Sequence, residues 1–169
     1  MDSYTAANTP SESTFAVLLG LFGTFFIVFV AIAVIWYVLQ ALGYYKLAKN
    51  RNISYAWISW IPICQDYLLG DLIGNEVWGF GHANWILVIG TIIASICASF
   101  ATETTPVFLL VVMMIYVIVF YVYRMTALYR LYQIYSDHAV LYLVLSIIFH
   151  FLTPVFIFII RNNEPKRTA

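Results

Sequence analysis

Two aspartates, Asp66 and Asp71, stand five residues apart in an otherwise apolar stretch. Ionisable side chains near a membrane commonly mark a transport pathway or a partner, which makes these carboxylates the first candidates for chemistry. On one helix their separation turns the side chains about 140° apart, which argues against a cooperating pair. The alternative places both in water at the cytoplasmic headgroup level. The cost of an aspartate in hydrocarbon, about 2.5–3.5 kcal/mol, favours this solvated placement.

Gln65 and His150 complete the candidate polar membrane site. His150 lies in the last hydrophobic segment, one turn before Pro154, where a histidine is suited to carry protons. We favour instead a bond to Thr153 or to the carbonyl that the proline frees, because hydrocarbon offers no other donor or acceptor. The spacing predicts that His150, Thr153 and Pro154 face protein. Three phenylalanines are then expected at the edges of this face or toward lipid: Phe149, Phe151 and Phe156.

The remaining reactive residues show no pattern that is typical of catalysis or metal binding. The histidines and the cysteines lack metal-ligand spacing. Glycine-rich phosphate loops, GxSxG and HExxH are not found in the sequence. We therefore predict no metal, no cofactor and no catalytic residue.

The composition indicates a membrane protein. The 169 residues are 63% hydrophobic and 9% charged, whereas soluble domains are about 25% charged. So much apolar surface cannot be buried in a chain of this length, and lipid is the consistent solvent for it. The formal net charge of zero gives no indication of a nucleic-acid partner.

The apolar stretches predict an all-α, polytopic membrane bundle. Four transmembrane helices are expected at residues 15–39, 85–101, 107–123 and 139–160. The third continues as an amphipathic helix to about residue 135, and the fourth is interrupted near Thr153 and Pro154. A polar segment, 1–14, precedes a single membrane domain, 15–160, and a polar tail, 161–169, follows it.

Residues 54–74 predict one interfacial or re-entrant element that is broken near Pro62. Five residues follow the 3- and 4-residue spacing of one helical face: Trp57, Trp60, Ile61, Cys64 and Leu68. The glycines and asparagines of residues 75–84 indicate a loop.

Basic residues fall in three clusters, and those of the first two are predicted to be interfacial anchors: Lys46, Lys49, Arg51, Arg124 and Arg130. The positive-inside rule puts these two clusters in the cytoplasm and the N-terminus outside. Arg124 is expected to reach the cytoplasmic interface, with pairing to an acidic group as the alternative. Four spans would leave the third cluster, 161–167, outside. A fold-back at Thr153-Pro154 would keep every cluster inside.

The run from Tyr44 to Gly74 carries a recognisable pattern. A tyrosine-rich helix end precedes Lys46, Lys49 and Arg51, and an AWxxWIP element follows at Ala56 to Pro62. In these features the chain resembles a group of small, uncharacterised multi-pass membrane proteins of Gram-positive anaerobes. The resemblance implies the membrane topology and implies no activity.

Three classes of function stay open. A non-enzymatic accessory or scaffold subunit is favoured, with the lipid bilayer and other membrane subunits or a second copy as partners. A small transporter or channel that uses the broken segment around Pro62 is the alternative. An intramembrane enzyme is third. We expect a multi-pass protein of the cell membrane.

Overall fold

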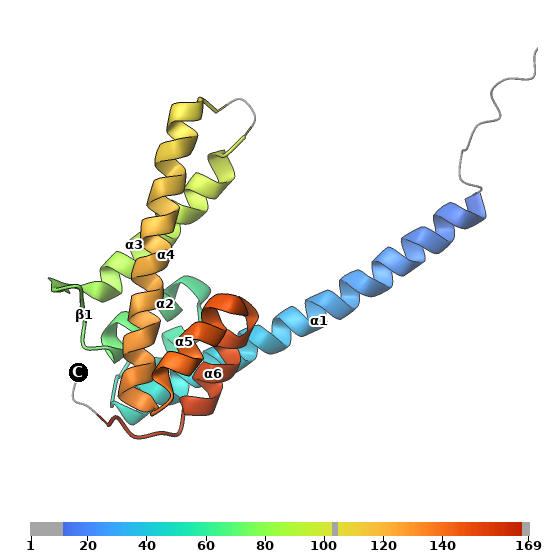
Figure 1. Cartoon of the computed structure of the whole chain (residues 1–169). Coiled ribbons are helices and arrows are strands. Elements are labelled where there is room, and N and C mark those ends of the chain that lie inside the picture. The colour runs from blue at the N-terminus through green and yellow to red at the C-terminus, as the bar shows by residue number, and fades with distance from the viewer. Residues whose placement is uncertain (1–11, 103–104, 167–169) are drawn as a thin grey trace, which may run out of the picture. The chain divides into compact units, whose positions relative to one another are not determined.

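The computed structural model describes residues 12–102 and 105–166, and almost all of them are helical. The chain divides into two compact units, 1–36 and 37–169. The first helix, α1 (Glu12–Asn50), begins in one unit and ends in the other (Figure 1). Within the first unit, the bulky apolar side chains between residues 15 and 35 are exposed, as expected of a helix surrounded by lipid.

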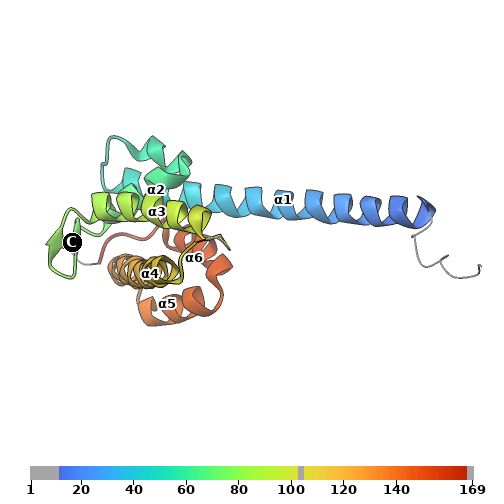
Figure 2. The same cartoon turned by 90° about the horizontal axis from the view of Figure 1, so that it is seen from above.

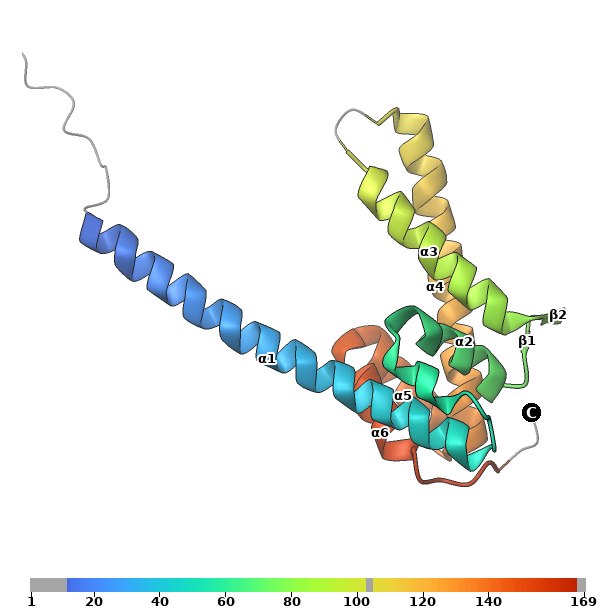
Figure 3. The ribbon, with the colours of Figure 1, turned by 180° about the vertical axis from the view of Figure 1, so that it is seen from behind.

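The second unit holds the remaining elements. In chain order they are η1 (Ala56–Trp60), α2 (Pro62–Leu72), β1 (Glu76–Val77), β2 (Phe80–Gly81), α3 (Ala83–Phe100), α4 (Val107–Tyr135), α5 (Ala139–Ile148), η2 (His150–Leu152) and α6 (Thr153–Ile160). Viewed from behind, α3 and α4 run side by side, and α2 packs on α3 (Figure 3).

Three helices are long and apolar enough to cross a membrane: Thr14–Asn50, Ala83–Phe100 and Val107–Tyr135. The predicted continuation of the third helix to residue 135 is confirmed. The fourth span is not confirmed, since the segment that carries it forms short helices of 10 and 8 residues. A 10-residue helix is about 15 Å long, half the thickness of the hydrocarbon core.

The helices α5 and α6 form a hairpin that returns the chain to the end of α4. Asn163 donates from its side chain to the Tyr135 carbonyl at 2.7 Å. The Lys166 backbone N–H donates to the Ile134 carbonyl at 2.8 Å, and the Lys166 ammonium pairs with Asp137. Seen from above, α5 and α6 lie beside α4 (Figure 2). The last segment therefore folds back, as the alternative to four spans requires.

The interruption of this segment begins earlier than the sequence predicts. Helix α5 ends at Ile148 and α6 begins at Thr153, so the interruption lies near Thr153 and Pro154 as predicted but begins a few residues before them. A proline inside a helix removes its bond to the carbonyl four residues earlier, here His150, and crowds that carbonyl. The tight turn of η2 avoids this conflict, and α6 begins with the proline in its first turn, where no N–H is needed.

The expected break near Pro62 is present, because the proline occupies the first turn of α2. The five residues that were expected to share one amphipathic face do not do so. Trp57, Trp60 and Ile61 are exposed, whereas Leu68 is fully buried. The change of direction between η1 and α2 separates them, since a helical period holds only within one continuous helix.

The predicted loop at 75–84 contains a small antiparallel hairpin. Glu76 pairs with Gly81 and Val77 with Phe80. Trp78 and Gly79 form the turn with φ angles of 54° and 78°, the two positive values that a type I′ turn requires. Apart from this two-residue ladder, the described residues agree with the all-α expectation.

The buried core lies where α2, α4, α6 and the last turns of α1 meet. Its largest fully buried side chains include Tyr44, Leu47, Leu68, Leu131, Tyr132, Tyr135 and Ile157. A Cβ on Gly70 would collide with the backbone of Asn84, so only glycine lets α2 and α3 pack this closely.

Candidate functional site

The candidate site is centred on Asp66, whose side chain is 4% exposed. Arg124 of α4 lies 3.0 Å from Oδ1 through its Nη2 atom. The Thr91 hydroxyl of α3 donates to Oδ2 at 2.6 Å. Three helices therefore meet at one carboxylate. The expectation that Asp66 is solvated is wrong, because neighbouring helices supply the partners that water was expected to supply.

Arg124 pairs with an acidic group, which was the alternative to its reaching the interface. Its side chain is 32% exposed, so the guanidinium lies at the edge of the site. The Nε atom is buried and has no hydrogen-bond partner within residues 12–102 and 105–166. The charge of Arg124 thus compensates Asp66 in a place where an unpaired carboxylate would be costly.

Asp71 belongs to a second, separate network. Its Oδ2 accepts a bond of 2.5 Å from the Tyr55 hydroxyl, and its Oδ1 accepts one of 2.9 Å from the Asn84 amide. The Asn75 amide donates to Oδ1 at 3.3 Å. The bond to the carboxylate, reinforced by partial burial, raises the pKa of Tyr55 to about 12. This carboxylate fastens η1 and the start of α3 to the end of α2.

Gln65 is buried and ties the two halves of the broken element together. Its amide donates to the Ser59 carbonyl of η1 at 2.9 Å. A carbonyl at the end of a short 3-10 helix lacks an intrahelical partner, and Gln65 supplies one across the break at Pro62. Gln65 therefore links η1 to α2 across the break.

His150 does not face protein as predicted. It is exposed at the turn between α5 and α6, and its ring centroid lies 6.4 Å from that of Tyr121. Thr153 and Pro154 are buried as expected. Phe149 and Phe151 are exposed as expected, but Phe156 is buried against the ring of Tyr142. The earlier break changes the helical phase, which moves His150 out and Phe156 in.

Among the predicted basic anchors, two arginines bond to backbone carbonyls, whereas the two lysines are exposed. Arg51 donates to the Leu72 carbonyl at 2.6 Å, and Arg130 donates to the Glu76 carbonyl. Leu72 ends α2, so its carbonyl has no helical donor, and Arg51 supplies one. Lys49 lies 5.8 Å from the centre of the Tyr45 ring, and Lys46 is exposed.

The first and third basic clusters meet in space. The side chain of Asn50, within the first cluster, donates to the carbonyl of Arg161 at 3.2 Å. Within the residues that the structure describes, no group of three or more histidine, cysteine or acidic residues is arranged to hold a metal ion.

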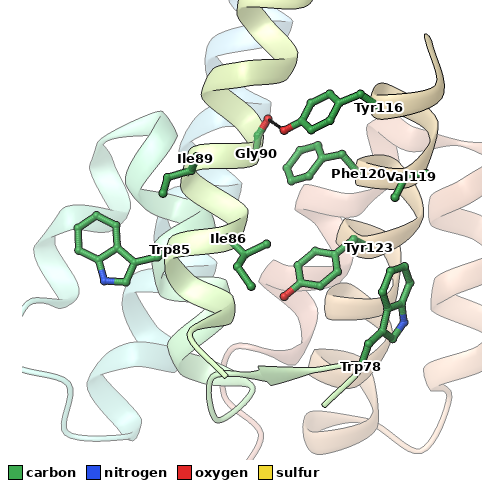
Figure 4. Close-up of a pocket in the computed structure, with 9 residues that line it drawn as sticks. All are labelled: Trp78, Trp85, Ile86, Ile89, Gly90, Tyr116, Val119, Phe120 and Tyr123. Atoms are coloured by element: carbon green, nitrogen blue, oxygen red, sulfur yellow. Dashed lines mark hydrogen bonds between the residues drawn. The ribbon is translucent and has the colours of Figure 1, made fainter. Parts of the chain in front are cut away.

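A groove of about 370 Å³ lies between α3 and α4 (Figure 4). Its lining is apolar and aromatic and consists of Trp78, Trp85, Ile86, Ile89, Gly90, Tyr116, Val119, Phe120 and Tyr123. The Tyr116 hydroxyl donates to the Gly90 carbonyl at 3.2 Å. The Phe120 ring occupies the space that a Cβ on Gly90 would need. Figure 4 shows Trp78 beside Tyr123, and their rings lie edge to face at 5.3 Å.

Comparisons of the chain with protein-family models, curated proteins and solved structures find no match. The assignment of roles therefore rests on geometry. Sequence reasoning missed three residues that complete the carboxylate networks: Thr91, Asn84 and Tyr55. Asn84 carried one usable signal, since an asparagine at the start of an apolar helix is a common capping residue.

Proposed function

We propose that the protein is a non-enzymatic, multi-pass protein of the cell membrane that serves as an accessory or scaffold subunit of a membrane assembly. The observation that carries this proposal is the environment of Asp66. Both carboxylate oxygens have partners from this chain, Arg124 and Thr91. A carboxylate used in this way joins helices, whereas a transported cation would need oxygens that are free to coordinate it.

A topology of three spans and one re-entrant hairpin, α5–α6, goes with this proposal. The return of residues 163 and 166 to the end of α4 supports it. The N-terminus is then extracytoplasmic, and α1, α3 and α4 cross in turn. All three basic clusters share the cytoplasmic side, as the positive-inside rule asks. The conflict that four spans created at the C-terminus no longer arises.

The exposed face of α3 supports a partner within the membrane. Ser95 and Ser99 are exposed on it, and small side chains let helices approach closely in lipid. The two serines bond to backbone carbonyls of their own helix, at 2.8 and 2.9 Å, so this face presents little unsatisfied polarity to a neighbour. The partner is another membrane subunit or a second copy of the chain.

Crosslinking in native membranes tests the subunit proposal. A photoreactive residue at Ser99 is expected to give a covalent product heavier than the monomer, containing either a second copy or a distinct membrane protein. The same residue at Val140, exposed on α5, is the matched control. Monomer alone at both positions would contradict the proposal.

The transporter alternative rests on Pro62, which breaks the helix four residues before a buried aspartate. Vesicles that contain the purified protein decide between the two. The subunit proposal predicts ion leakage no faster than in empty vesicles. Leakage that Asp66→Asn abolishes would instead establish transport.

A further inference from the structure

We infer that the groove between α3 and α4 is a binding site for one anionic glycerophospholipid, with an acyl chain in the groove and the phosphate on Arg130. This inference goes beyond the proposed subunit function and does not depend on it. Its starting point is an apolar groove with a cation at one end.

The groove itself fits a hydrocarbon chain. Its volume of about 370 Å³ lies within the range of ligand pockets, which is about 300–1,000 Å³. Gly90 and the Phe120 ring fit against each other on its floor. The Tyr116 hydroxyl and the Gly90 carbonyl bond to each other, so neither is left unsatisfied in the groove. An acyl chain needs shape and dispersion contacts only, and these walls supply both.

Arg130 lies on α4 beyond the end of the groove that Trp78 and Tyr123 form. From α4, the groove is lined by Tyr116, Phe120 and Tyr123. Arg130 follows Tyr123 by two turns on the same face of the helix. Its Nη1 atom donates to the Glu76 carbonyl, two residues before the Trp78 wall of the groove. The guanidinium is therefore held beside the hairpin that carries the Trp78 wall of the groove.

The guanidinium keeps capacity for an anion. Within residues 12–102 and 105–166, the ion pairs are Arg124 with Asp66 and Lys166 with Asp137, so Arg130 has no carboxylate partner there. A guanidinium carries five donors in a fork that matches phosphate oxygens. Trp78, which is 48% exposed, lies on the same hairpin as the Glu76 carbonyl that holds the guanidinium, and tryptophan is common at membrane interfaces.

Tyr123 adds an independent sign of an absent neighbour. The residue is 6% exposed, and its hydroxyl is buried without a hydrogen-bond partner among the described residues. A buried hydroxyl that donates to nothing costs about 1–3 kcal/mol. Figure 4 shows this hydroxyl directed toward Ile86 across the groove, on the side away from Trp78, where an ester oxygen of the bound lipid would accept its hydrogen bond.

Native mass spectrometry tests the inference. The full chain in detergent receives phosphatidylglycerol or phosphatidylethanolamine at equal concentration and is then released from the detergent in the instrument. The wild type is expected to retain one phosphatidylglycerol in preference to phosphatidylethanolamine. Arg130→Gln is expected to lower the retained fraction about tenfold, as the loss of a charge-assisted bond would. Val119→Trp, which puts a ring into the groove from a position that is 53% exposed, is expected to lower it for both lipids.

Two matched variants serve as controls. Lys49→Gln removes an exposed cation elsewhere, and Val111→Trp adds the same ring to an exposed position on another face of α4, outside the groove. Both are expected to retain lipid like the wild type. Because Arg130 also holds the hairpin, Arg130→Lys checks folding and is expected to keep the preference for phosphatidylglycerol. Equal losses in Arg130→Gln and Lys49→Gln would overturn the inference, as would equal losses in Val119→Trp and Val111→Trp or equal retention of the two lipids.

Discussion

Asp66 on α2 and Arg124 on α4 form an ion pair with 3.0 Å between Oδ1 and Nη2. The pair joins the broken element to the longest helix of the second unit, and Thr91 adds α3 to the same carboxylate. Burying a charge is costly unless it is paired and hydrogen-bonded. The position of α2 in the fold therefore depends on these two contacts.

Asp66→Ala is expected to destabilise the folded protein by about 3 kcal/mol, the lower end for removing one partner of a buried pair. Arg124 is left without its carboxylate, but its partial exposure lets water reach it. Asp66→Asn is expected to cost less because an amide oxygen still accepts from Thr91.

Unfolding in mixed micelles measures the stability of both Asp66 variants. Asp137→Asn, at an exposed ion pair, is the control and leaves the unfolding midpoint unchanged. An equal midpoint for Asp66→Ala and the control would refute the role of the pair.

Gly70→Ala is expected to destabilise the protein by about 1–3 kcal/mol, as overpacking does. The added methyl group would meet the backbone of Asn84 and force α2 and α3 apart. Gly20→Ala is the matched control, because a Cβ at Gly20 meets nothing within 4 Å. There the better helix propensity of alanine leaves stability unchanged or slightly raised. Thermal unfolding in detergent compares the two, and a neutral Gly70→Ala would show that the close contact is not needed.

The Tyr55–Asp71 bond predicts a loss of stability at alkaline pH. The folded protein holds the Tyr55 proton with a pKa of about 12, against 10.0 for an unperturbed tyrosine. The contribution of this bond to stability is complete below pH 10 and is lost as the pH rises from about 10 toward about 12.

Tyr55→Phe is expected to flatten the dependence of stability on pH in this range. Asp71→Asn is expected to return the pKa of Tyr55 toward 10. Ultraviolet titration of tyrosine in both variants checks this. An unchanged titration in Asp71→Asn would show that the carboxylate is not the cause.

Some features of the fold follow from single residues and were predictable. Pro62 ends one helix and begins another because it lacks an N–H, and the apolar run from Val107 to Tyr123 needs no tertiary information to be a helix. The hairpin at Trp78-Gly79 was missed. A tryptophan rarely takes a positive φ angle, so only the following glycine hinted at the turn.

The contacts between distant segments were not predictable in the same way. Periodicity places Asp66 and Arg124 each on a helix face but does not say which faces meet. The sequence offered both features only as alternatives: an acidic partner for Arg124 and a fold-back of the last segment. The distribution of charge suggests such arrangements but does not choose between them. The position of His150 was predicted wrongly because the helix breaks before this residue, at the end of α5, and not after it. The side chains that follow the break therefore point in other directions than a continuous helix would give them.

The side of the membrane on which the C-terminus lies tests the central claim most directly. Single cysteines at Lys49, Glu164 and Ser3, in a chain whose Cys64 and Cys97 are replaced by serine, are to be labelled with an impermeant maleimide in intact cells and in disrupted membranes. With the re-entrant hairpin, Lys49→Cys and Glu164→Cys react only after disruption, and Ser3→Cys reacts in intact cells. A Glu164→Cys variant that reacts in intact cells, while Lys49→Cys does not, would establish a fourth span and contradict the account.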